Sequence, residues 1–191
     1  MKKIVYLIVI FIITSTIQAK EGVLVKILDG DTLHFKTENK INKCKMAYID
    51  SPENTHNNKL QKDIKTCKDI SLTEMLNAGN SATKNAKKIL QIGKTYSYSI
   101  NNDNINEKIC EVALGNGITY SEQMLIDGYA VLWKEFKKRQ DEQNFNSLLV
   151  HAKNKNNGLW GNISKQGEAI RCLDEIKNNH NETSNTDYHS K

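Results

Sequence analysis

Apolar and polar residues alternate in several short segments of this chain, and turn residues separate the segments. Residues 22–35 have the pattern of strand, turn and strand, with Asp29, Gly30 and Asp31 forming the turn. The same period of two predicts further strands at residues 43–49, 95–100 and 109–114. Residues 129–133 form one more short extended run.

Other segments carry apolar residues at spacings of three and four, which is typical of amphipathic helices. This spacing predicts three main helices, at residues 80–90, from Ser121 to a stop at Gly128, and at residues 144–156. A shorter helix is expected at residues 70–78. Residues 54–68 are polar and rich in lysine, so a loop is expected there. The chain from residue 174 onward is polar and is expected to be disordered.

The order of these elements predicts the fold class. Five short strands, with helices between the third and fourth strands and after the fifth, are typical of an α+β protein built on a small barrel. We therefore expect a five-stranded OB-type Greek-key β-barrel with three main helices. We place this domain at residues 20–162, with residues 163–191 as a C-terminal extension.

The N-terminus has the features of an export signal. Lys2 and Lys3 precede an unbroken apolar run at residues 4–13, and a more polar segment of small residues ends at Ala19. We predict that residues 1–19 are a signal peptide and that the protein is secreted or periplasmic. The alternative is an uncleaved membrane anchor, although the apolar run is short for a membrane span. No stable membrane insertion is expected after cleavage.

The expected export places the four cysteines of the chain in an oxidising compartment. Cys44, Cys67, Cys110 and Cys172 contain no CxxC pair, which argues against a zinc site, and an even number in an exported chain favours two disulfides. Three connectivities are open. Cys44 and Cys110 both fall in predicted strands, so we favour pairing them with each other and Cys67 with Cys172.

The net charge of the chain is weak evidence about its partners. The 191 residues include 27 Lys and Arg against 22 Asp and Glu, a formal net charge of +5, which favours anionic partners such as nucleic acid. Nearly all of the positive charge is lysine, because Arg139 and Arg171 are the only arginines. Lysine binds a phosphate as a point charge, whereas arginine can bind it through two parallel hydrogen bonds.

The candidate chemistry lies where two predicted strands end in acidic turns. Asp31 belongs to the first turn, and Asp50 and Glu53 follow the third strand. Three carboxylates in one small region repel each other unless a cation lies between them. This pattern predicts a site for a hard metal ion, and lysines near such a site favour phosphodiester chemistry.

The motifs that carry these residues, and several later ones, occur in a familiar order. They are DGDT at residues 29–32, IDSPE at 49–53, ATKNAKKIL at 82–90, EVALGNG at 111–117, SEQMLIDGYAVLW at 121–133 and AKNKNNGLWG at 152–161. In this order and spacing the chain resembles the staphylococcal-nuclease-like, or thermonuclease, family, as a secreted bacterial member.

The resemblance implies a five-stranded OB barrel and calcium-dependent hydrolysis of DNA and RNA to 3′-phosphates, without sequence specificity and by a monomer. By motif, Asp31 and Asp50 match the calcium ligands of the family, and the backbone carbonyl of Ser51 matches a third ligand. Glu53 matches the general base. Lys45 occupies the position of an arginine that clamps the phosphate.

The chain also departs from the family pattern. The second catalytic arginine aligns with Glu107 or, one residue later, with Lys108, so both guanidinium groups are absent and we assign Lys108 as the second basic group. Ile105 and Lys134 stand where relatives present tyrosines to the nucleotide. The alternative function is therefore an OB-fold nucleic-acid-binding protein with weakened catalysis, although a pure binder would not need three carboxylates beside a phosphate.

Overall fold

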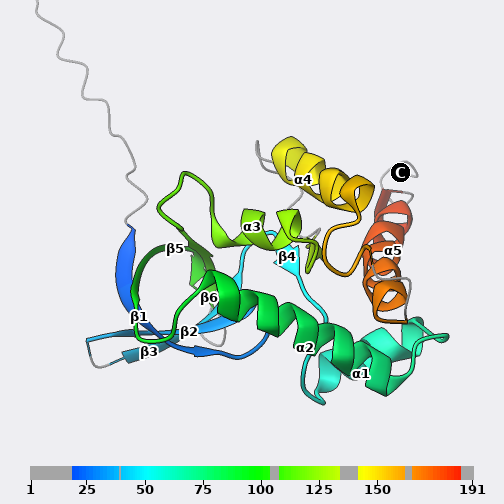
Figure 1. The fold of residues 1–191 in the computed structure, drawn as a ribbon, viewed down its shortest axis with the longest axis horizontal. Coiled ribbons are helices and arrows are strands. Elements are labelled where there is room, and N and C mark those ends of the chain that lie inside the picture. Colours follow the sequence, from blue (N-terminus) through cyan, green and yellow to red (C-terminus); the bar gives the residue numbers. More distant parts are fainter. Residues whose placement is uncertain (1–18, 39, 104–107, 134–141, 162–164, 186–191) are drawn as a thin grey trace, which may run out of the picture.

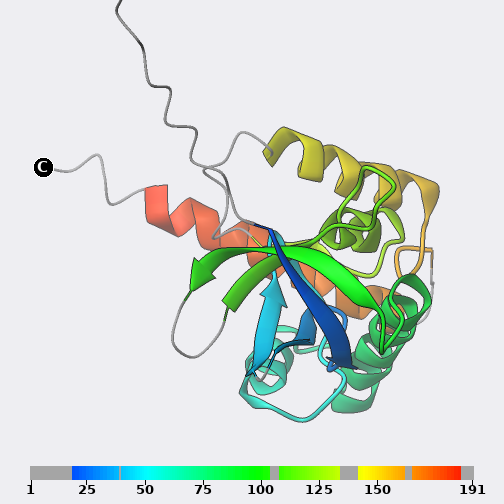
Figure 2. The ribbon, with the colours of Figure 1, turned by 90° about the vertical axis from the view of Figure 1, so that its left-hand side faces the viewer.

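Five strands of the protein close into a β-barrel. The computed structural model describes residues 19–38, 40–103, 108–133, 142–161 and 165–185. The barrel strands are β1 (Lys20–Ile27), β2 (Thr32–Thr37), β3 (Lys40–Met46), β5 (Thr95–Asp103) and β6 (Lys108–Val112). Their order is β1-β2-β3-β6-β5, and β1 pairs with β5 to complete the closure (Figure 2). The pairing of β3 with β6 is parallel and the other pairings are antiparallel. This architecture confirms the predicted α+β fold built on a five-stranded OB-type barrel.

The alternation seen in the sequence sets the barrel interior. Leu33 and Phe35 on β2 are fully buried, whereas His34 between them is only partly buried. The Phe35 ring stacks on the ring of Tyr98 from β5, with 4.7 Å between centroids. Side chains on one face of each strand therefore fill the barrel, as the period of two requires.

A small second sheet lies next to the barrel. It pairs β4 (Ile49–Asp50) with β7 (Val131–Leu132) in antiparallel fashion, and Asp50 lies opposite Val131. Strand β4 follows β3 after a turn at Tyr48, whose φ is +68°. This turn brings Asp50 back toward the start of β2, so the small sheet contributes directly to the candidate site.

Within the described residues, five helices accompany the barrel, two more than the three main helices expected. They are α1 (Asn58–Thr66), α2 (Leu72–Ile89), α3 (Tyr120–Ile126), α4 (Glu142–Lys155) and α5 (Lys165–Asn185) (Figure 1). Helix α2 joins the two helices expected at residues 70–78 and 80–90, and Ser71 and Glu74 form a capping box at its start. None of the helices in the described ranges is long and apolar enough to cross a membrane.

Helix α1 occupies the segment that was expected to be a loop. Asn57 caps its N-terminus by accepting a hydrogen bond from the backbone N–H of Leu60, at 2.8 Å. Leu60 is fully buried, and a disulfide holds Cys67 at the C-terminal cap. A cap, a buried anchor and a covalent link thus stabilise a helix whose sequence is mostly polar.

Helix α5 continues through residue 174, where disorder was expected to begin, so that expectation does not hold for this helix. Ala169, Ile170 and Leu173 are fully buried. Asp174 forms an ion pair with Lys153 of α4, with 2.5 Å between Nζ and Oδ2. These contacts attach the polar C-terminal helix to the rest of the fold.

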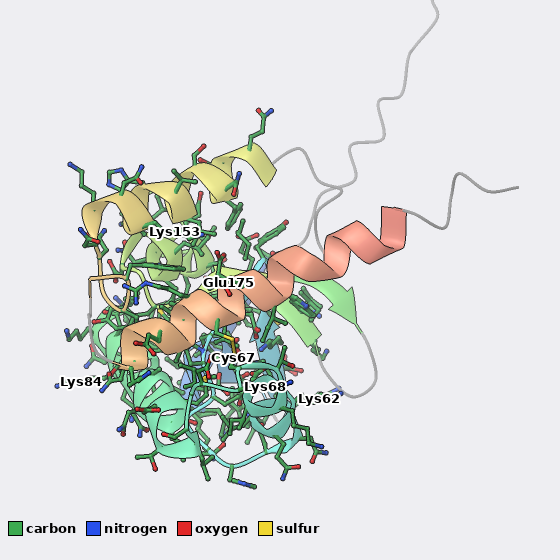
Figure 3. All side chains as sticks on the ribbon, turned by 90° about the vertical axis from the view of Figure 1, so that its right-hand side faces the viewer. Lys62, Cys67, Lys68, Lys84, Lys153 and Glu175 are labelled. Atoms are coloured by element: carbon green, nitrogen blue, oxygen red, sulfur yellow. A yellow bond between two sulfur atoms is a disulfide. The ribbon has the colours of Figure 1, made fainter. Side chains whose placement is uncertain are left out.

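Both disulfides connect the cysteines in the favoured pattern. Cys44 on β3 is bonded to Cys110 on β6, with 5.4 Å between their Cα atoms. Cys67 is bonded to Cys172 on α5, with 5.9 Å between Cα atoms, and Figure 3 shows Cys67 beneath this helix. The first bond links two barrel strands, and the second fixes α5 to the end of α1.

Candidate active site

The backbone at one end of the barrel brings Asp31 and Asp50 together. Asp31 directly precedes β2, and its carbonyl accepts a hydrogen bond from the N–H of Met46 at 2.7 Å. Its fully buried carboxylate accepts the backbone N–H of Ser51 through Oδ2, at 2.6 Å. Because Ser51 follows Asp50, this bond joins the DGDT turn to the IDSPE segment.

Lys45 lies between the two aspartates. Its Cα is the register partner of Thr32, so β3 presents it beside the start of β2. Its Nζ lies 2.6 Å from Oδ1 of Asp31 and 3.4 Å from Oδ1 of Asp50. The lysine therefore neutralises part of the charge that would otherwise separate the aspartates.

Glu53 reaches the same region from the loop between β4 and α1. Its carboxylate is nearly buried, and its Oε2 accepts a hydrogen bond from Nδ2 of Asn57 at 2.6 Å. The following residue, Asn54, donates to the carbonyl of Leu28 at 2.8 Å and to the hydroxyl of Thr83 at 2.9 Å. The loop is thus attached both to the barrel and to helix α2.

Helix α2 approaches this loop so closely that only glycine fits at one position. A Cβ atom added to Gly79 would overlap the backbone carbonyl of Glu53. The absent side chain lets the helix backbone support the loop directly. Gly79 is therefore a positioning residue for Glu53.

Lys59 of α1 is a further charged group of the site, and sequence reasoning missed it. Its Nζ lies 3.2 Å from Oδ1 of Asp50, 3.0 Å from Oε1 of Glu53 and 3.3 Å from Oδ2 of Asp63. It also donates to the carbonyl oxygen of Ser51 at 3.1 Å. One ammonium group is thus surrounded by four oxygens from the IDSPE segment and its own helix.

The pKa values of the two lysines reflect these carboxylates. Burial alone would lower the pKa of Lys45, but Asp31 and Asp50 outweigh it and raise the pKa. Burial would likewise lower the pKa of Lys59, and the carboxylates around it raise the pKa well above its usual value. Both side chains therefore carry a positive charge at neutral pH.

Asp29, also in the DGDT turn, has a strongly raised pKa. Burial raises its pKa to about 8, and the negative charges of Asp31 and Glu53 act in the same direction. Its Oδ1 accepts the backbone N–H of Asp31 at 3.0 Å. This hydrogen bond, between residues two apart, shapes the turn that presents Asp31.

These residues surround a cavity of about 360 Å³. Its lining is formed by Leu28, Asp29, Thr32, Lys43, Lys45, Asp50, Glu53, Asn57, Lys59 and Trp133. The walls thus combine carboxylates, ammonium groups and one indole ring. A cavity with these groups can hold an anionic ligand and a cation side by side.

The structure brings most of the predicted site residues together. Asp31, Asp50, Ser51, Glu53 and Lys45 all lie at this end of the barrel, joined by the contacts described above. The remaining candidate is placed elsewhere. Lys108, at the start of β6, has Cys44 as its register partner and does not line the cavity. Glu107, Ile105 and Lys134 lie outside the described residues.

The oxygens around Lys59 also test whether a hard cation fits. Carboxylate and carbonyl oxygens are the ligands that calcium prefers, normally at about 2.3–2.6 Å. Four such oxygens already surround one positive charge at 3.0–3.3 Å. In the described part of the chain, no group of three or more His, Cys, Asp and Glu side chains is arranged to hold a metal ion as it stands. The oxygen ligands are of the kind that calcium binds. In this structure, however, the Lys59 ammonium lies among them.

Comparison with known proteins gives two matches. The model of a family described as Staphylococcal nuclease homologue matches residues 43–162, which is more than half of the 191-residue chain. Endonuclease YhcR of Bacillus subtilis (strain 168) is 24% identical over 147 residues, which cover 73% of this chain and 11% of that protein. The chain thus spans about a tenth of the length of this relative. The family match includes Lys45, Asp50, Glu53 and Lys59, whereas Asp31 precedes it.

Proposed function

This chain belongs to the Staphylococcal nuclease homologue family, and we propose that it is a calcium-dependent nuclease that hydrolyses phosphodiester bonds of DNA and RNA to 3′-phosphate products. The observation that carries the proposal is that Asp50, Glu53 and Lys45 line one cavity, with the buried carboxylate of Asp31 paired to Lys45 at 2.6 Å. An endonuclease among the similar proteins supports it.

The residues proposed to hold calcium are Asp31 and Asp50, through their carboxylates, and Ser51, through its backbone carbonyl. When bound, the ion would supply positive charge to a phosphoryl oxygen of the substrate. Asp31 is already fixed by the Ser51 N–H, so its orientation does not depend on the ion.

Glu53 is proposed as the general base. A carboxylate can accept the proton of the attacking water only when an oxygen is correctly oriented. Asn57 holds Oε2 of Glu53 at 2.6 Å, and helix α2 supports the loop from behind. These contacts fix the base before any substrate is present.

Lys45 is proposed to stabilise the charge that develops on the phosphate. It supplies a point charge from the barrel wall, without the two parallel hydrogen bonds of an arginine. A second basic contribution from Lys108 stays a prediction, since this residue does not line the cavity.

Export of the chain is also a proposal. The two disulfides of the described structure are of a kind that persists in oxidising compartments. Together with the expected signal peptide at residues 1–19, they favour a secreted or periplasmic enzyme.

The alternative is a nucleic-acid-binding protein with little catalysis. It is favoured by the lysines that already neutralise the carboxylates, and by lysine at position 45. The two functions differ in turnover and not in binding, so they can be separated directly.

Purified protein without residues 1–19 should be incubated with single- and double-stranded DNA and with RNA, in calcium and then in chelator. We expect cleavage that requires calcium and leaves 3′-phosphate ends, which a phosphatase-dependent end-labelling assay detects. Tight binding of the same substrates without cleavage would support the alternative and overturn the proposal.

A further inference from the structure

Lys59 contacts two of the three groups that the proposed function assigns to a cation, Asp50 and the Ser51 carbonyl, while the third, Asp31, is paired with Lys45. The Nζ of Lys59 contacts Asp50, Glu53 and the Ser51 carbonyl at 3.0–3.2 Å. Two of these three residues are proposed calcium ligands and the third is the proposed base. A positive charge at this place repels any second cation that approaches the same oxygens.

The same contact also holds the base. Oε1 of Glu53 is the partner of Lys59 at 3.0 Å, and Oε2 is the partner of Asn57 at 2.6 Å. Both oxygens of the carboxylate are therefore engaged. Each oxygen can accept a second hydrogen bond, but the Lys59 ammonium occupies one acceptor position of the base and attracts the negative charge that would draw a proton from water.

The Lys59 side chain is nevertheless able to move away from Asp50 and Glu53. It belongs to α1, a helix on the outside of the barrel, and 28% of its side chain is exposed. Asp63, one helical turn further on, lies 3.3 Å from its Nζ. Since Asp63 belongs to the same helix, Lys59 can leave Asp50 and Glu53 and keep this partner.

We propose that Lys59 is a tethered cation that closes the calcium position and engages the general base until calcium displaces it. The inference rests on the proposed function, because it takes calcium as the competing ion. The Lys59 ammonium neutralises the carboxylates when no metal ion is bound. Because calcium has to displace it, the site binds calcium only where the ion is abundant. Calcium binding would then open the ion site and release one oxygen of Glu53 in the same event.

The test is calcium binding measured by isothermal titration calorimetry, which does not depend on cleavage. Lys59→Met keeps the length of the side chain and removes its charge, and we expect the Kd for calcium to fall about ten- to hundredfold. Lys59→Arg keeps the charge and should not tighten binding. Lys62→Met removes an exposed charge from the same helix and should leave the Kd unchanged (Figure 3). A Kd for Lys59→Met equal to or weaker than that of the wild type would overturn the proposal.

A second measurement applies even if Lys59→Met fails to fold. Nitrogen-15 NMR of the lysine Nζ groups in the wild-type protein, with the Lys59 signal assigned from Lys59→Arg, should show this signal moving when calcium is added. The Lys62 signal should stay in place. An unmoved Lys59 signal at saturating calcium would contradict displacement.

Cleavage assays on the same proteins separate this inference from the proposed function. If Lys59→Met binds calcium more tightly and no protein cleaves DNA, the inference stands and the nuclease proposal fails. If the wild type cleaves with calcium and the Kd does not change in Lys59→Met, the inference fails and the nuclease proposal stands.

Discussion

Asp31, Lys45 and Asp50 lie in the barrel and sheet strands or directly before them, whereas Asn57, Lys59 and Asp63 belong to the short helix α1 and its cap. We refer to these sets as the barrel half and the helix half of the site. Lys45, Asp50, Asn57 and Lys59 line the cavity, and Asp31 and Asp63 pair with the two lysines. In the barrel half, backbone hydrogen bonds and strand register fix each side chain. In the helix half, a nine-residue helix with few buried residues carries the groups.

The comparison indicates different roles for the two halves. Strands in a closed barrel resist displacement, so the barrel half suits ligands whose geometry must be preserved. A short peripheral helix can adjust at lower cost, so the helix half suits groups that move when a cation enters. Glu53 lies between the halves and is contacted by both Asn57 and Lys59.

The largest effect is expected in the barrel half. Asp31→Asn and Asp50→Asn should each abolish calcium-stimulated cleavage, because each removes a proposed ligand. Asp31→Asn should also destabilise the protein by about 2–4 kcal/mol, because it leaves the buried Lys45 ammonium with one carboxylate partner fewer. Urea denaturation and a cleavage assay of one oligonucleotide measure both quantities.

Asp69→Asn is the control for these variants, since Asp69 is exposed and outside the cavity. It should change neither stability nor cleavage. Wild-type cleavage by either ligand variant would show that the barrel half does not hold the ion.

Gly79→Ala tests the support that α2 gives to Glu53. The new methyl group would overlap the Glu53 carbonyl, so the loop or the helix has to shift. We expect a stability loss of about 1–3 kcal/mol and a cleavage rate lowered by roughly a hundredfold. Lys84→Ala, at an exposed position of the same helix, should be neutral (Figure 3). An unchanged rate in Gly79→Ala would mean that Glu53 does not need this support.

Asn57→Ser separates the two tasks of the cap residue. Serine can still cap α1, whereas it is too short to reach Oε2 of Glu53 as Asn57 does. Stability should therefore change little, and the cleavage rate should fall about tenfold because the base is less well oriented. Comparison with Asn57→Ala, which also loses the cap, gives the contribution of the helix itself. Equal rates in Asn57→Ser and wild type would remove Asn57 from the catalytic arrangement.

The smallest effect is expected for Lys108→Ala. Lys108 does not line the cavity, so its removal should lower the cleavage rate by less than about threefold. Steady-state rates at fixed calcium and salt measure this. A severe loss would place the second basic group at Lys108, as the resemblance implied, and would extend the site beyond the described cavity toward β6.

The barrel half could be predicted from the sequence because its residues follow strongly patterned strands. DGDT and IDSPE each end an apolar run, and adjacent strand ends converge. The disulfide between Cys44 and Cys110 followed from the same pattern, since both residues lie in strands. Local alternation and turn chemistry were sufficient for this part of the fold.

The helix half could not be predicted with the same rules. Helix α1 has only Leu60 and Ile64 as apolar residues, and its stability depends on the Asn57 cap and the distant Cys172. Asn57 as a possible N-cap, followed by the apolar residues Leu60 and Ile64 four apart, was the local signal that could have predicted this helix. Lys59 was missed with the helix, because a lysine in a polar segment gives no sign of its pairing with the buried carboxylates of Asp50 and Glu53. Helix α5 was underestimated for a similar reason, since its anchors are tertiary contacts.

A crystal structure of the protein grown in saturating calcium tests the central claim most directly. We predict a calcium ion bound by Asp31, Asp50 and the Ser51 carbonyl, with these barrel and sheet groups close to their present places. The Lys59 ammonium should then have left Asp50 and Glu53, with which it now forms ion pairs at 3.2 and 3.0 Å. An ion bound elsewhere, or Lys59 still in contact with both carboxylates beside a bound ion, would contradict the account.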